Sequence, residues 1–256
     1  MEIKRTKFTK IFLIFALLVL QNIVLNAQTP MAKAEKFYKE RNFEAAAIQY
    51  KNLIANGYES PELYYNLGNT YYRLGRNGLA ILYYEKALRL SPGDEDIQYN
   101  LKIVNAHTAD KIDVLPELEV IRFFKDIPAL FTVDGWTVIG LYVYLVMIIL
   151  FIVTVLSKEK RLKQIFRISA LSSGLLLFMA VLMLFVRWHT ETSVTYGVVI
   201  EAVSTVKTEP DNQSRDAFVI HEGLKAEIDD SVQDWKKIRL PDGKSGWISE
   251  KDIRII

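Results

Sequence analysis

Hydrophobic residues are spread unevenly along the chain, and three long apolar runs indicate the class of protein to which it belongs. The runs lie near residues 11–25, 135–156 and 168–186. The second run contains no charged residue, and its length of about 22 residues is enough to cross a hydrocarbon core of about 30 Å. The third is slightly shorter and is followed by Arg187 and Trp188, a pair suited to the membrane interface. We therefore predict transmembrane helices over 135–156 and 168–186.

The first apolar run follows four basic residues within the first ten positions, which is the pattern of a secretory signal peptide. Ala27 is small enough to precede a cleavage site, so we expect the signal to cover residues 1–27. Leu25 is bulkier than usual two positions before a cut, which leaves an uncleaved anchor as the alternative. Either outcome exports the residues that follow.

The segment between the two predicted spans, residues 157–167, carries five basic residues against the single acidic Glu159. Short basic loops stay on the cytoplasmic side, so residues 28–134 and 187–256 should lie outside. The alternative is a pair of core helices in a soluble protein, where such runs flanking a basic hairpin are rare. No charge interrupts either span, which argues against an ion path and against transport.

Residues 61–94 contain a spaced pattern of small and aromatic positions. It reads Tyr64-x-x-Leu67-Gly68-x-x-Tyr71, then Ala80-x-x-x-Tyr84, Ala87 and Pro92, and it resembles a tetratricopeptide repeat. Small residues leave room where the two helices of a pair cross, and the larger ones fill the space around them. We place the turn between the helices at residues 75–78.

A weaker repeat lies 34 residues earlier. Its Ala34, Phe37, Ala46 and Tyr50 correspond to Gly68, Tyr71, Ala80 and Tyr84 of the second repeat. This first repeat departs from the pattern at two positions, where Lys33 replaces the leucine and Leu53 replaces the second alanine. After the second repeat, residues 95–107 form one more helical run with Asp94 as its N-cap, which we interpret as a capping helix. Two repeats and a cap over residues 28–108 are near the minimum that folds, because repeats must stack to bury a continuous core.

The resemblance to tetratricopeptide repeats implies a peptide groove lined by the first helix of each pair. Tyrosines with an amide and a guanidinium suit an extended peptide, although ordinary packing between helices is the alternative for each of them. The positions that match the inner side of the groove are Tyr38, Tyr65, Asn69, Tyr72, Arg73 and Tyr99.

Residues 109–134 form a linker in which Pro116 begins a new segment. From residue 117 to 127, apolar positions fall on one side of a helical wheel and charged positions on the other. This pattern predicts an amphipathic helix at the membrane interface, or one that packs against the repeat module.

Residues 187–256 alternate short apolar strands with turn signals, which is typical of a small β-barrel or sandwich. The turn Pro241-Asp242-Gly243 lies between two tryptophan-bearing segments that resemble a bacterial SH3 domain. That resemblance implies binding of wall peptides or protein segments by Tyr196, Trp235 and Trp247; the alternative is that the tryptophans belong to the core. The predicted strands cover 198–202, 217–221, 224–228, 235–240, 244–249 and 253–256.

The sequence contains no pattern of residues that is typical of an enzyme active site. The net charge of +2 argues against nucleic-acid binding, and the lack of cysteine excludes disulfides, thiolate catalysis and iron–sulfur clusters. The three histidines, His107, His189 and His221, share no metal-ligand spacing. We find no phosphate loop, nucleophile elbow or paired carboxylates, so we predict a protein without catalytic residues, metal or cofactor.

The order of these modules is similar to that of the BatE proteins of the Bacteroides aerotolerance operon. The resemblance implies a multi-pass protein of the bacterial inner membrane with both soluble modules in the periplasm. It also implies partners with von Willebrand factor A domains, a MoxR-type ATPase, and a role in aerotolerance or envelope stress. Two hypotheses follow: an assembly scaffold acting through the repeats, or an envelope sensor whose SH3-like domain binds peptidoglycan.

The predicted fold is therefore a multidomain membrane protein. It combines an all-α repeat solenoid, a two-helix transmembrane hairpin within the lipid bilayer, and a small all-β SH3-like barrel. The predicted order is signal peptide (1–27), repeats with capping helix (28–108), linker and interfacial helix (109–134), first transmembrane helix (135–156), cytoplasmic basic loop (157–167), second transmembrane helix (168–186) and SH3-like domain (187–256).

Overall fold

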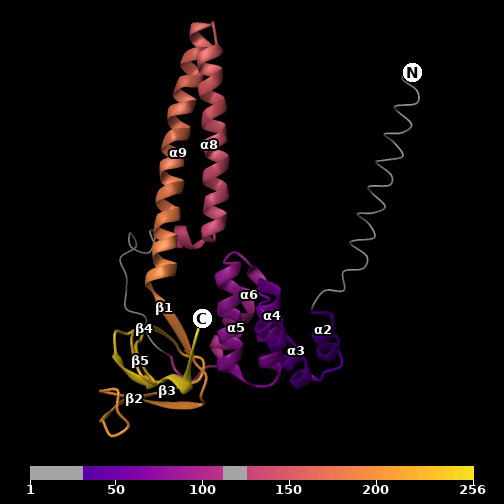
Figure 1. Ribbon diagram of the computed structural model, residues 1–256, viewed down its shortest axis with the longest axis vertical. Helices are drawn as coiled ribbons and strands as arrows, with labels where there is room; N and C mark the ends of the chain where they lie inside the picture. The colour runs from indigo at the N-terminus through magenta and orange to yellow at the C-terminus, as the bar shows by residue number, and fades with distance from the viewer. Residues whose placement is uncertain (1–30, 112–125) are drawn as a thin grey trace, which may run out of the picture. The chain divides into compact units, whose positions relative to one another are not determined.

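A helical hairpin begins the part of the chain that the computed structural model describes, which is residues 31–111 and 126–256 (Figure 1). The chain separates into two units, residues 1–59 and 60–256. The first unit contains α2 (Ala32–Lys39) and α3 (Phe43–Ala55). Asn42 caps α3 by accepting a hydrogen bond from the Ala45 N–H at 3.2 Å. The predicted signal peptide and most of the predicted interfacial helix lie outside the described residues.

The second unit starts with α4 (Pro61–Arg73), α5 (Asn77–Leu90) and α6 (Glu95–Ala106). A Cβ added to Gly68 would lie 2.7 Å from the Tyr84 ring, so the glycine allows α4 and α5 to approach as the spacing predicted. Asp94 caps α6 by accepting from the N–H groups of residues 96 and 97, which confirms the predicted N-cap. The predicted turn is wrong at its last two positions, because Asn77 and Gly78 lie inside the first turn of α5.

Two long apolar helices follow, α8 (Val133–Leu156) and α9 (Lys160–Ser193), and they lie side by side as a hairpin (Figure 1). Both are long and apolar enough to cross a membrane. The prediction of a loop over 157–167 is wrong in extent, since α9 begins at Lys160. The reason is local: residues 160–167 contain neither glycine nor proline, and lysine, arginine, leucine and glutamine favour helix, so the helix continues beyond its apolar part.

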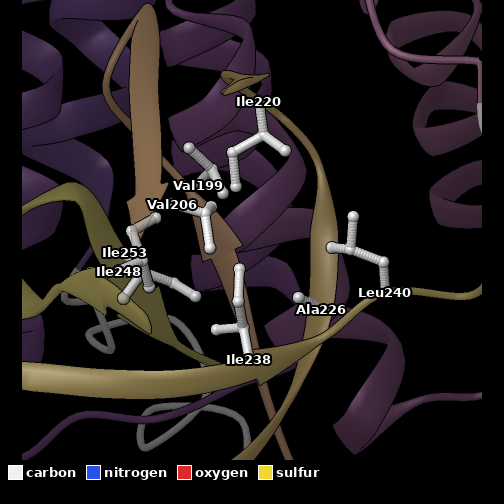
Figure 2. Close-up of a cluster of buried hydrophobic side chains, with 8 residues drawn as sticks. All are labelled: Val199, Val206, Ile220, Ala226, Ile238, Leu240, Ile248 and Ile253. Atoms are coloured by element: carbon white, nitrogen blue, oxygen red, sulfur yellow. The ribbon is translucent and has the colours of Figure 1, made fainter. Parts of the chain in front are cut away.

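The C-terminal residues form a seven-stranded antiparallel sheet with the strand order β3-β2-β6-β5-β4-β1-β7. One face carries a cluster of buried apolar side chains, including Val206, Ile238 and Ile248 (Figure 2). The strands are β1 (Thr195–Val199), β2 (Val203–Lys207), β3 (Asp216–His221), β4 (Lys225–Val232), β5 (Trp235–Arg239), β6 (Ser245–Ser249) and β7 (Ile253–Ile255).

The predicted strands agree with the structure at the C-terminal end and differ at the start. The Pro-Asp-Gly turn joins β5 to β6, with Gly243 at φ 89° and its N–H donating to the Leu240 carbonyl at 2.9 Å. The predicted strand 198–202 is displaced, because β1 ends at residue 199. We missed β2 because Val203 faces solvent and the small Ser204 is buried, which obscures the alternation of apolar residues.

Helix α5 packs directly on the sheet within the second unit. The Gly78 N–H donates to the Glu222 carboxylate at 3.0 Å, and a Cβ at Gly78 would lie 2.7 Å from the Val199 carbonyl oxygen. Farther along α5, the Glu85 carboxylate accepts from Lys225 Nζ at 2.7 Å. We call this contact, formed by Gly78, Glu85, Val199, Glu222 and Lys225, the repeat–sheet junction.

The chain after α6 also contacts the sheet. Asp110 accepts from the His221 backbone N–H at 2.7 Å, and its second oxygen lies 2.8 Å from His221 Nδ1. Gly223 has φ 87°, and a Cβ there would lie 2.7 Å from atoms of Ile81 and Thr108. Residues near the end of β3 are therefore held both by α5 and by the segment after α6.

Candidate protein-interaction surface

One side of α4 carries four of the residues predicted to line a peptide groove. Tyr65, Asn69, Tyr72 and Arg73 recur at helical spacing, whereas the buried residues of α4 lie on the opposite side. The first three are half-buried and Arg73 is exposed. Helical periodicity thus brings these four side chains to a common face.

Three helices are tied together at this face by hydrogen bonds. The Tyr84 hydroxyl donates to Asn69 Oδ1 at 2.6 Å, and Asn100 Nδ2 donates to the same oxygen at 3.0 Å. Asn100 Nδ2 also donates to the Tyr65 hydroxyl at 2.9 Å. We call Tyr65, Asn69, Tyr84 and Asn100 the amide network. Asn100 was missed from the sequence, although it is adjacent to the predicted Tyr99.

The two remaining groove candidates lie elsewhere. Tyr99, on α6, is 65% exposed and is available for contact with a partner. Tyr38 belongs to the first unit, where its ring makes an edge contact with Phe43 at a centroid distance of 5.3 Å. Tyr38 therefore has at least one packing role within its own helical hairpin.

The tryptophans of the predicted SH3-like surface lie on the same face of the sheet. Trp235 pairs with Ser249 and Trp247 with Lys237, so both rings lie opposite the face that carries the apolar core. Both are half-buried. The structure separates Tyr196 from them, because its row in the sheet meets β5 at Arg239, about 13 Å along the strand from Trp235.

Trp235 lines an open hollow of about 770 Å³. Lys236, Lys251 and Arg254 contribute positive charge to its wall, against Asp234 and Glu250. Lys236 and Glu250 form an ion pair at 3.5 Å. The sequence predicted the aromatic ring but not the cationic wall, which β5, the short helix η1 (Glu250–Asp252) and β7 bring together.

Comparison with known proteins addresses the N-terminal helices. Residues 31–95 match the tetratricopeptide repeat. This part of the chain is a tetratricopeptide repeat region. The match covers both predicted repeats and stops at the beginning of α6. A search among curated proteins found no match.

Repeats of this kind bind other proteins, and the amide network offers suitable chemistry within the repeat region. Its hydrogen bonds use the side-chain oxygens of Asn69 and Tyr65 as acceptors. The amide hydrogens of Asn69 and the hydroxyl hydrogen of Tyr65 are not consumed by these bonds, so they can donate to backbone carbonyls. An extended peptide presents such carbonyls at regular intervals.

Stacking within the repeat region holds another group of tyrosines. The Tyr83 ring stacks on Tyr71 at 5.5 Å and on Tyr64 at 6.2 Å. Burial, followed by the neighbouring Tyr71 and Tyr64 hydroxyls, raises the pKa of Tyr83 to about 12, while Arg254 opposes the rise. The Tyr83 ring therefore stays neutral at ordinary pH, and the stacked rings stabilise the contact between α4 and α5.

Proposed function

We propose that this protein is a non-enzymatic membrane scaffold that binds partner proteins through its repeat region. The observation that carries the proposal is the face of α4, where hydrogen bonds to α5 and α6 hold Tyr65 and Asn69 in place while their hydrogens remain available as donors. Side chains held by packing and by neighbouring hydrogen bonds bind with less loss of conformational entropy. Such a surface favours an extended segment of a partner protein.

We further propose that α8 and α9 anchor the protein in the bacterial inner membrane. Their length and apolar surface support this, as does the group of basic residues at the start of α9. The same rule would place the repeat region and the sheet in the periplasm. The two soluble modules would then act near the membrane surface.

The proposed partners come from the similarity to the BatE proteins. That similarity favours a complex involved in aerotolerance or envelope stress, containing proteins with von Willebrand factor A domains. It rests on the order of the modules along the chain: repeats, two apolar helices, then a domain that resembles bacterial SH3.

Co-purification of the full chain from detergent-solubilised membranes tests the scaffold. Changing Tyr65, Asn69 and Tyr72 to alanine should lower partner recovery at least tenfold, about 1.4 kcal/mol. Tyr72→Ala alone, outside the amide network, should lower recovery while leaving the thermal unfolding unchanged. Tyr58→Ala, an exposed tyrosine beyond α3, is the matched control. If the triple variant and Tyr72→Ala both recover the partner as well as the wild type does, the α4 face is not the binding surface.

A second candidate function is an envelope sensor whose SH3-like domain binds peptidoglycan. The hollow beside Trp235 favours it, because an aromatic ring and three cationic side chains suit the sugar rings and carboxylates of wall material. The full chain in detergent should sediment with purified wall sacculi, and Trp235→Ala should release it into the supernatant. A wild-type chain that stays in solution rules this function out.

A further inference from the structure

A second cavity, of about 480 Å³, lies where the C-terminal end of α9 meets α5 and the sheet, all within residues 60–256. Five charged side chains line this cavity. Arg89, Arg187 and Lys225 are positive, whereas Glu85 and Glu191 are negative. Arg187 and Lys225 pair with the two carboxylates, and Arg89 donates to the Ile256 backbone oxygen at 3.4 Å, so the case for an anion rests on the individual donors of the wall and not on its net charge.

Arg187 is the most informative residue of this wall. Its Nη2 forms an ion pair with Glu191 at 2.6 Å, and its side chain is only 14% exposed. Its Nε is buried and has no hydrogen-bond partner among the described residues. A buried N–H group without a partner is rare in native proteins, and a bound ion or ligand is one of its ordinary explanations. An oxyanion that reached the Arg187 Nε would supply the missing acceptor.

Lys225, at the start of β4, is the cationic side chain that the sheet contributes to the cavity. Lys225 bonds Glu85 at 2.7 Å and lies 4.9 Å above the Tyr196 ring. These contacts fix the lysine at the wall instead of allowing it to fill the space. Lys225 and Arg187 are thus held at the wall as two ion pairs, with Glu85 and Glu191.

An apolar groove of about 360 Å³ lies next to this cavity along α9. Leu184, Phe185 and Trp188 line the groove, and Arg187 and Glu191 line the cavity, so the two share the same stretch of helix. Val133 and Thr137 of α8 form the opposite wall. A molecule with an anionic head and an apolar tail matches this succession of charged and apolar walls.

We propose that the cavity binds the phosphate headgroup of an anionic phospholipid, with one acyl chain in the apolar groove. The Arg187 guanidinium donates from Nε to a phosphate oxygen, and Lys225 contributes its ammonium group from β4. Arginine suits this role because its planar donors match phosphate oxygens. The site rests on the membrane location proposed above for α8 and α9.

The test uses the full chain reconstituted into phosphatidylcholine nanodiscs that contain phosphatidylglycerol, followed by native mass spectrometry of the lipids that remain bound. The wild-type chain should retain phosphatidylglycerol over phosphatidylcholine, and Arg187→Gln should lower that retention at least tenfold. Arg187→Lys, which keeps the charge, should lower it less. Arg161→Gln, at the opposite end of α9, is the matched control and should retain lipid as the wild type does.

Two further arms separate the sources of the phosphate. Inorganic phosphate and soluble glycerophosphate should not displace the retained lipid, because neither fills the apolar groove. Equal retention by wild type and Arg187→Gln, equal retention of the two lipids, or displacement by inorganic phosphate would each overturn the proposal. A chain that fails to enter nanodiscs would refute the membrane anchor itself, whereas a chain that enters without selective retention would refute only the lipid site.

Discussion

Gly78→Ala is the substitution that most directly tests the repeat–sheet junction. The added Cβ would lie 2.7 Å from the Val199 carbonyl oxygen and 3.2 Å from both Glu222 Cβ and the Gly223 nitrogen. Two of these atoms belong to the backbone and cannot rotate away. Helix α5 and the sheet would have to move apart.

The net effect of this substitution is the difference between a small gain and two larger losses. Alanine in place of glycine favours a helix by about 1 kcal/mol at most. Overpacking costs about 1–3 kcal/mol, and weakening a hydrogen bond to a charged group such as Glu222 costs up to about 1.5–3 kcal/mol. We expect a net destabilisation of about 2 kcal/mol, which lowers the melting temperature of a unit of this size by about 4–8 °C.

The assay is thermal unfolding of the full chain in detergent, followed by tryptophan fluorescence. Because the sequence contains no cysteine, Glu85→Cys and Lys225→Cys can be combined to measure crosslinking across the junction with a short bismaleimide. Gly93→Ala is the control, since a Cβ there would meet nothing within 4 Å. A Gly78→Ala protein that melts and crosslinks as the Gly93→Ala protein does would refute the assigned contact.

Three further predictions concern α5 and its neighbours. A double-mutant cycle of Glu85→Gln and Lys225→Met, followed by unfolding, should give a coupling of about 0.5–1 kcal/mol because the lysine is partly exposed; a coupling of zero contradicts the ion pair. Gly68→Ala should destabilise the chain by about 1–3 kcal/mol in the same assay, since its Cβ would press on the Tyr84 ring. The pKa of Tyr83 is about 12 in the folded chain and about 10 when unfolded, so its contribution to stability is complete below pH 10 and is lost as the pH rises towards 12. Absorbance titration near 295 nm should detect this late ionisation, and Tyr83→Phe should lose one tyrosine equivalent from a late phase to which Tyr50, whose pKa is also raised to about 12, still contributes.

The helices of the repeat region could be predicted because their signals are local. Gly68 and the residues around it are spaced by the period of a helix, and Asp94 precedes its helix at the capping position. The long apolar helices were recognisable for the same reason. The start of α9 could not be predicted in this way. The charged residues from Lys160 onward are polar enough to indicate a loop, yet each of them has a high helix propensity.

The contacts between elements could not be predicted from periodicity. Gly78 and Glu222 are 144 positions apart, and Asp110 and His221 are 111 apart, so no local pattern links them. Gly78 has the additional ambiguity that a glycine near a helix start is ordinarily assigned to a turn. Asn100 was missed because it completes a network whose other members lie on two different helices.

Helix α5 connects the α4 face proposed for the scaffold to the sheet that carries the surface proposed for the sensor. Its Tyr84 hydroxyl bonds Asn69 in the amide network, while its Gly78 and Glu85 contact the sheet. Shared contacts do not by themselves transmit a signal, because a ligand shifts another site only if it binds two states of the connecting element differently. The close glycine contact at Gly78 favours a single arrangement. We therefore expect Lys225→Met, which removes one junction contact without adding volume, to leave partner affinity at the α4 face unchanged within twofold in a pull-down titration. A larger change would mean that the junction is a switch between two arrangements and not a fixed connection.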